Sequence, residues 1–211
     1  MLDIVQAPNL VLSQKAKPIN KVDKSIQHLI KQMEVTLDHT KDPEGVGLAA
    51  PQIGKSLQLF IIRQSPRSPL LTFINPVIEE FIDAAPNEKA PVKQSKKIAK
   101  AKKNLASTKE GLADQSGKHA GERNVQLEGC LSLYSIWGVV NRHYGVVLSY
   151  QDETGAHHKK KFDGFLATII QHEFDHLQGI LFPKRVLEQE NQLYKAKTDA
   201  KGEVEFEEIE L

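Results

Sequence analysis

The stretch that most constrains this chain is residues 171–179, Q-H-E-F-D-H-L-Q-G, which follows an apolar run at 165–170. His172 and His176 are four positions apart, so on a helix both imidazoles lie on one face and can reach one metal ion. Glu173 lies about 100° around the helix from His172, where it can contact a water on the metal without ligating the metal. Because this polar group directly follows an apolar run, the sequence favours a buried helix with a polar centre over a solvated helix.

Two imidazoles leave a tetrahedral metal site incomplete, so a third protein ligand is expected. The long zincin motif fails, because Phe182 stands where that motif has its third histidine. Glu188 and Glu190 are possible carboxylate ligands. Their spacing matches no zincin pattern, however, and Pro183 is expected to end the helix before them.

The remaining candidate ligand is Cys130, the only cysteine of the chain, within E-G-C-L-S at 128–132. A lone cysteine is most often an ordinary small buried residue. Here Gly129 allows the backbone to come close to a site, and a thiolate suits a metal that is short of one ligand. A single cysteine also excludes an internal disulfide and is typical of a reducing cytoplasm.

A third stretch, G-V-G-L-A-A-P-Q at 45–52, is a glycine-rich turn followed by small residues and an amide. Taken alone it predicts only tight packing. Together and in this order, the three stretches closely resemble the signature motifs of the peptide deformylases, and the resemblance extends from I-V-Q-A-P-N-L-V-L at 4–12 to G-I-L-F at 179–182. It implies an α+β fold, with mixed or antiparallel sheets packed around a central metal-binding helix.

The resemblance also implies the reaction, which is removal of the formyl group from N-formyl-methionyl peptides with release of formate. Cys130, His172 and His176 would hold the metal and leave the fourth position to water, with Glu173 as the general base and acid. The side-chain amide of Gln52 and the backbone N–H of Leu131 would stabilise the oxyanion.

A methionine side chain requires an apolar pocket, and the resemblance places its lining at a set of small and apolar residues. These substrate-binding residues are Val46, Gly47, Leu131, Phe165, Thr168 and Ile169, all of which would equally serve as ordinary core. The peptide is expected to bind like an added strand near Gly47 and the strand after Ser132. Family members usually have proline at the position of Tyr134, so Tyr134 and the nearby Trp137 suggest an altered peptide preference.

The bound ion is expected by resemblance to be Fe²⁺, although a mixed thiolate and imidazole site also accepts Zn²⁺, Ni²⁺ or Co²⁺. The expected partners are N-formyl-methionyl peptides and the ribosome near its exit tunnel. The formal net charge of +1 gives no general attraction to DNA or to membranes. The chain has no apolar run of transmembrane length and no evident signal peptide, so we expect a cytoplasmic protein.

We expect one domain over residues 1–211, with a lysine-rich insertion at about 84–123 and an acidic C-terminal tail at about 198–211. The insertion is interpreted as a solvated segment; contact with ribosomal RNA is the alternative. The glutamates of the tail indicate a solvated segment, although the alternation of Val204 and Phe206 also suits an edge strand.

The spacing of Ile26, Ile30, Met33 and Leu37 predicts a packing helix over 23–40 with Asp23 as its N-cap. Strands are predicted at 57–63, 71–78, 138–141, 145–150 and 158–162, with a turn at 152–155. The second strand is interrupted by Asn75-Pro76, and a short amphipathic helix is predicted at 186–196.

Two other functions fit these residues less well. A different metal-dependent peptidase or amidase would use the same ligands. A non-catalytic ribosome-associated protein would have no use for an intact Glu173 and three metal ligands.

Overall fold

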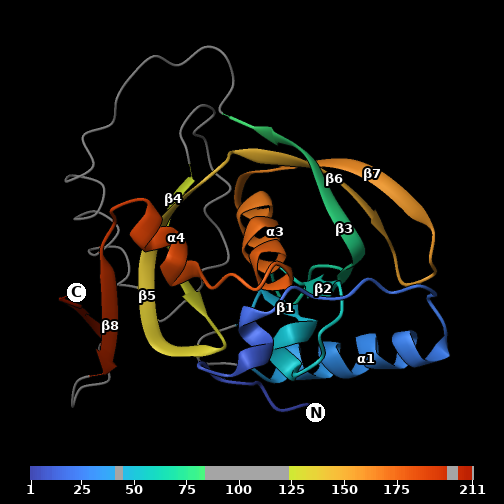
Figure 1. The fold of residues 1–211 in the computed structure, drawn as a ribbon, viewed down its shortest axis with the longest axis horizontal. Coiled ribbons are helices and arrows are strands. Elements are labelled where there is room, and N and C mark those ends of the chain that lie inside the picture. The colour runs from blue at the N-terminus through green and yellow to red at the C-terminus, as the bar shows by residue number, and fades with distance from the viewer. Residues whose placement is uncertain (41–44, 84–123, 199–203, 211) are drawn as a thin grey trace.

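The computed structural model describes residues 1–40, 45–83, 124–198 and 204–210, and its helix α3 lies between two β-sheets (Figure 1). The helical elements are η1 (Leu10–Ser13), α1 (Lys24–His39), η2 (Ala50–Ile53), α3 (Gly164–Leu177) and α4 (Phe182–Glu188). The strands are β1 (Gly47–Ala49), β2 (Leu59–Ile62), β3 (Leu71–Ile82), β4 (Asn124–Cys130), β5 (Leu133–Arg142), β6 (Gly145–Gln151), β7 (His157–Asp163), β8 (Leu193–Thr198) and β9 (Val204–Glu208). The predicted insertion at 84–123 lies outside the described residues.

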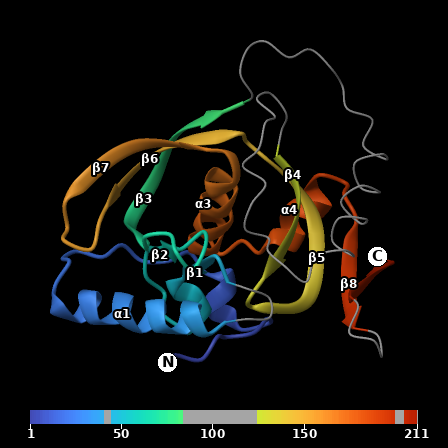
Figure 2. The same ribbon diagram turned by 180° about the vertical axis from the view of Figure 1, so that it is seen from behind.

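One sheet has the strand order β1-β2-β3-β6-β7 and the other has the order β4-β5-β8-β9, and the strand pairs within both are antiparallel. Helix α3 contacts β1, β2, β6 and β7 of the first sheet and β4 of the second. The view from behind shows the same arrangement, with α1 running along one side of the first sheet (Figure 2). The expected α+β fold with antiparallel sheets around a central helix is therefore confirmed.

Strand β2 is buried along its whole length, because both faces of its sheet are covered. Phe60 and Ile62 belong to a core cluster with Ile170 of α3, whereas Leu59 and Ile61 belong to a second cluster with Met33 of α1. A strand that is buried on both faces has a continuous apolar sequence rather than an alternating one, as L-F-I-I does.

Helix α1 begins and ends close to its predicted bounds. The side chain of Asp23 accepts hydrogen bonds from the backbone N–H groups of Ser25 and Ile26, which is the predicted N-cap. Met33 is fully buried, so the prediction that it belongs to the core is confirmed.

Strand β3 continues through Asn75 and Pro76, where the sequence predicted an interruption. A register shift between Ile74 and Val77 absorbs the proline, which has no N–H to donate. Asn75 adopts a positive φ of 48°. Its side-chain amide bonds both the N–H and the carbonyl of Ile19, at 2.8 and 2.7 Å, and this holds the bulge in place.

The helix predicted at 186–196 is wrong beyond Glu188, since α4 ends there and residues 193–196 belong to a strand. Helix α4 begins at Phe182 and includes Pro183 in its first turn, where the missing N–H of proline costs nothing, so Pro183 starts a helix and does not end α3, whose last residue is Leu177. Strand β8 follows and pairs with β5, and β9 pairs with β8 as an edge strand. Residues 204–208 of the predicted solvated tail are therefore in a sheet.

Candidate metal centre

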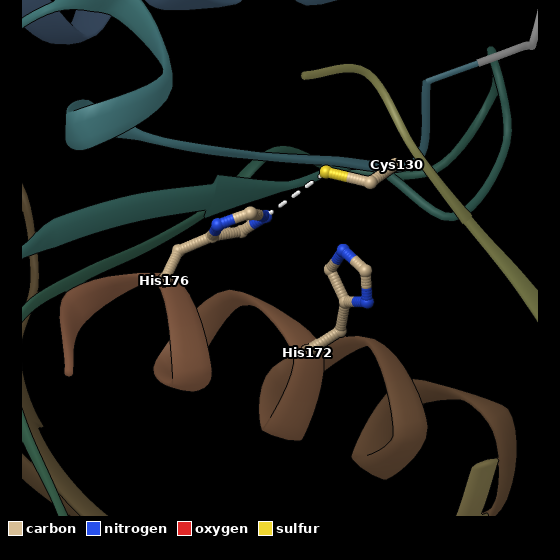
Figure 3. A group of neighbouring side chains, drawn as sticks. All are labelled: Cys130, His172 and His176. Atoms are coloured by element: carbon tan, nitrogen blue, oxygen red, sulfur yellow. Dashed lines mark hydrogen bonds between the residues drawn. The ribbon is translucent and has the colours of Figure 1, made fainter. Parts of the chain in front are cut away.

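Helix α3 carries the histidine pair at the centre of the fold. Its apolar residues Ala167, Ile169 and Ile170 pack in the core cluster beneath the first sheet, which fixes how the helix faces the second sheet. His172, Glu173 and His176 follow on this helix, and Figure 3 shows both imidazoles on one side of it. Glu173 and His176 are buried and His172 is nearly so.

Cys130 comes from the last position of β4, far from α3 in sequence. Its sulfur lies 3.3 Å from Nε2 of His176 (Figure 3). One ligand atom each from Cys130, His172 and His176 falls within 4.8 Å of the others. The three side chains predicted to form the metal site are thus brought together, while Glu188 is at the C-terminal end of α4 and Glu190 lies beyond it.

The chemistry of this donor set fits a divalent transition ion. Nδ1 of His172 is bonded to the carboxylate of Glu128 at 2.9 Å, which leaves its Nε2 available to an ion. Although burial acts to lower it, contacts with Cys130 and Glu128 raise the pKa of His172 well above its ordinary value, whereas burial lowers the pKa of His176. A thiol and two imidazoles therefore face one point, and these are ligands suited to zinc and iron(II).

Glu173 is buried directly beside this centre, with only 3 % of its surface exposed. Within the described part of the chain its Oε2 has no hydrogen-bond partner, and burial raises its pKa to about 7. A Cβ atom on Gly47 of β1 would lie 2.4 Å from Oε1 of Glu173. Only glycine leaves room for the carboxylate here, which explains the second glycine of G-V-G-L-A-A-P-Q.

A series of buried ion pairs fixes the position of Glu128, the carboxylate that is bonded to His172. Arg142 of β5 donates two hydrogen bonds to Glu128, at 2.8 and 2.9 Å, and a third to Asp175 at 2.6 Å. Asp175 is also bonded to Arg185 of α4. Although burial opposes it, the charge of Arg142 holds the pKa of Glu128 at about 2, so Glu128 presents a full negative charge to the imidazole.

Glu128 and Asp175 lie within two of the motifs of the sequence, but the ion pairs that they form were not predicted, and Arg142 was missed. Asp175 contacts neither imidazole through a bond that the structure describes; it binds the two arginines. Arg142 stands at the end of an apolar stretch, G-V-V-N-R. This position indicates a buried guanidinium, which requires carboxylate partners.

The amide of Gln52 has a fixed orientation. Its Oε1 accepts a hydrogen bond of 2.8 Å from the backbone N–H of Ala49, and this contact assigns oxygen and nitrogen because an N–H requires an acceptor. Its Nε2 consequently points toward the sulfur of Cys130, at 3.5 Å. Gln52 is 1 % exposed, so it is a buried donor aimed at the metal centre.

The predicted substrate-binding residues lie near the centre as packing residues. Val46 and Phe165 pack against the core cluster that contains Ile169, and Leu131 packs against the cluster of α1. Thr168 is also buried. A cavity of about 490 Å³ has a different lining, which consists of Leu37, Asp38, Thr40, Gly45, Arg63, Ser65 and Pro66. The methionine pocket therefore stays a prediction.

Tyr134 stands where members of the family usually have proline, and Trp137 lies nearby. The two side chains have different environments. Tyr134 is 75 % exposed near the start of β5. Trp137 packs over Gly129, where an added Cβ would lie 3.0 Å from its ring, and contacts Phe206 of β9 edge-on. Trp137 thus joins the strand of Cys130 to the C-terminal hairpin, whereas Tyr134 is open to solvent.

Comparison with known proteins places this geometry in context. Residues 1–192 match the family model described as polypeptide deformylase. A peptide deformylase of Chloroflexus aggregans is 35 % identical over 83 % of this chain and 80 % of its own length, and one of Chlorobium phaeovibrioides is 30 % identical over 98 % and 90 %. A peptide deformylase of Synechococcus elongatus, crystallised with actinonin, superposes with a TM-score of 0.64 at 32 % identity, covering 87 % of this chain and 78 % of that one.

A structure from Acinetobacter baumannii is described as a class I type b peptide deformylase with Met-Ala-Ser bound. It superposes with a TM-score of 0.63 at 27 % identity and covers 88 % of this chain and 98 % of that one.

Among the described residues, no helix combines the length and apolar character that crossing a membrane requires.

Proposed function

This chain belongs to the polypeptide deformylase family, a family of metal-dependent hydrolases that remove the N-formyl group from nascent polypeptides, and from that premise we propose how its residues carry out the reaction. One observation carries the proposal. Three ligand atoms, one each from Cys130, His172 and His176, converge within 4.8 Å beside the buried carboxylate of Glu173.

Cys130, His172 and His176 hold one divalent ion, and Glu128 fixes the ring of His172 through Nδ1. When bound, the ion polarises the formyl carbonyl and lowers the pKa of a nearby water. Fe²⁺ is the ion we propose, on family resemblance, with Zn²⁺, Ni²⁺ and Co²⁺ as alternatives that the same ligands accept.

Glu173 acts twice as the water adds to the formyl carbon. It first takes a proton from the attacking water and then delivers this proton to the amine nitrogen as the carbon–nitrogen bond breaks, so that formate and a free amine leave. The unpartnered Oε2 of Glu173 supports this role, since no bond within the described residues holds it away from the substrate.

Gln52 and the backbone N–H of Leu131 stabilise the carbonyl oxygen as it becomes negative. The fixed amide of Gln52 supports its part, because its oxygen is already used by Ala49 and its nitrogen is left to donate. A donor that is held in place before the reaction needs no reorganisation during it.

The substrate is a formyl-methionyl peptide whose first side chain contacts Val46, Leu131, Phe165, Thr168 and Ile169. The peptide backbone adds to β1 at Gly47, where β1 is an edge strand of its sheet. As the substrate is a nascent chain, we further propose a cytoplasmic enzyme that acts near the ribosomal exit tunnel. If the 84–123 segment assists there, deleting residues 86–122 should reduce affinity for ribosomes and leave hydrolysis of free peptides unchanged.

The test is release of formate from formyl-Met-Ala, compared with cleavage of unformylated Met-Ala, by protein prepared anaerobically with its metal. We expect stoichiometric formate and intact Met-Ala, and a loss of turnover in Glu173→Gln with the fold retained. Cleavage of the Met-Ala bond without release of formate would instead identify a metal-dependent peptidase on the same scaffold.

A further inference from the structure

The N-terminal segment at residues 5–7 contacts both elements that carry the proposed oxyanion donors. The backbone N–H of Val5 donates to the carbonyl of Gln52 at 2.8 Å, and the backbone N–H of Ala7 donates to the carbonyl of Ser132 at 3.0 Å. Between them, Nε2 of Gln6 donates to the carbonyl of Leu131 at 2.9 Å. Three consecutive residues thus bond the donor residue Gln52 on one side and the turn after Cys130 on the other.

From these contacts we propose that Gln6 is a positioning residue for deformylation, and that with its two neighbours it sets the spacing between the Gln52 amide and the Leu131 N–H. The inference rests on the proposed function, which assigns those two groups as donors. Gln52 lies in η2 after β1 and Leu131 follows β4, so the two donors come directly after strands of different sheets. Residues 5–7 form a direct link between them.

The turn at Leu131 needs an outside contact of this kind. Pairing between β4 and β5 changes register after Gly129, so that Cys130 pairs with Leu133 and residues 131 and 132 form the turn. The Leu131 carbonyl accepts from Gln6, which fixes the peptide plane between Leu131 and Ser132 and so limits how far the backbone of Leu131, with its N–H, can turn.

Because Gln6 lies at the surface, an effect of its side chain on catalysis can be separated from an effect on protein stability. Gln6 is exposed, whereas Gln52 and Ser132, which its neighbours contact, are 1 % and 0 % exposed. Removing the Gln6 side chain leaves the core and both main-chain bonds intact. Its loss should therefore raise the free energy of the transition state and hardly change the melting temperature.

The experiment compares Gln6→Ala and Gln6→Glu with Gln27→Ala in the metal-loaded enzyme acting on formyl-Met-Ala. Gln27 is a matched control, since its exposed amide also donates to a distant backbone carbonyl, that of Glu153 at 3.3 Å. We expect kcat of Gln6→Ala to fall about threefold to tenfold with KM changed less than twofold, as for loss of one hydrogen bond felt in the transition state. Gln6→Glu should fall further, because a carboxylate would face the Leu131 carbonyl, and Gln27→Ala should match the parent enzyme.

A second readout is independent of activity. Hydrogen exchange of the Leu131 amide, measured without substrate, should be faster in Gln6→Ala than in the parent and unchanged in Gln27→Ala. Equal kcat and equal Leu131 exchange in the two alanine variants would overturn the proposal while leaving deformylase activity intact. No formate from the parent enzyme would refute the proposed function itself, and the exchange measurement would still show whether Gln6 holds Leu131.

Discussion

Gly47→Ala should disable Glu173 without touching a metal ligand. The added Cβ would lie 2.4, 2.8 and 2.9 Å from Oε1, Cδ and Cγ of Glu173, whereas an ordinary contact begins at 3.4 Å. The carboxylate must therefore move by about 1 Å, since Gly47 is held in β1 by its pairing with β2 and cannot retreat freely.

A misplacement of about 1 Å in a catalytic group costs roughly 100-fold in rate, which corresponds to about 2.7 kcal/mol of barrier. We expect kcat for formate release by Gly47→Ala to fall by about this factor. Gly47 is not one of the three residues of the proposed metal site, so the metal content should stay at the parent value, and the melting temperature should drop modestly because the Glu173 side chain must shift.

The control is a double-variant cycle with Glu173→Gln. If Gly47→Ala acts only through the base, the double variant should be no slower than Glu173→Gln alone, so the two losses will be far from additive. Fully additive losses would refute the reasoning, as would parent-like activity in Gly47→Ala.

Three further predictions concern other parts of the structure. Gln52→Glu keeps an acceptor for the backbone N–H of Ala49 but replaces the donor, so kcat should fall about 100- to 1,000-fold, and the melting temperature should also drop because the new carboxylate is buried without a cationic partner. Arg142→Met leaves Glu128 and Asp175 buried without their shared partner, and urea titration should show a loss of about 3–5 kcal/mol in the free energy of unfolding. Although partial burial opposes it, bonds from its own turn and from the strand that follows hold the pKa of Asp152 below its ordinary value of 3.8. Because this side chain is partly in contact with solvent, Asp152→Asn should cost no more than about 1 kcal/mol at pH 7. This difference should shrink as the pH falls below 3.8, because the unfolded chain takes up its proton first and the folded state loses the charged form only at a still lower pH.

The sequence predicted those elements whose signals are local. Asp23 caps its helix as expected, because the cap needs only the two N–H groups that follow it. The hairpin of β6 and β7 also lies close to its predicted bounds, since the carboxylate of Asp152 closes the turn through Thr154 and Ala156.

The prediction for the segment after α4 was wrong, because the structure of this segment depends on partners that are distant in the sequence. Residues 193–196 continue an acceptable helical pattern in isolation, yet β5 offers an open edge to which Tyr194 and Lys195 pair. No residue close to β8 in the sequence indicates that this edge is available for pairing. Tertiary pairing overrides a weak local preference in such a case.

The candidate site divides in the same way. His172, Glu173 and His176 are recognisable from spacing alone, because one helix places them. Cys130 became a candidate because the histidine pair lacks a third ligand, and the resemblance to a family strengthened it, since no local rule brings the end of β4 to α3. Arg142 has only a weak sequence signal, its place at the end of an apolar stretch, and Gln6 has none, as both side chains bond residues far along the chain.

The most direct test of the account is X-ray absorption at the edge of the bound metal in protein loaded with Zn²⁺. The chain contains a single cysteine, so any thiolate ligand must be Cys130. We expect one ion per chain, with one sulfur at about 2.3 Å and two imidazole nitrogens at about 2.0–2.1 Å, and loss of the sulfur in Cys130→Ser. An ion surrounded only by nitrogen and oxygen would contradict the proposed centre.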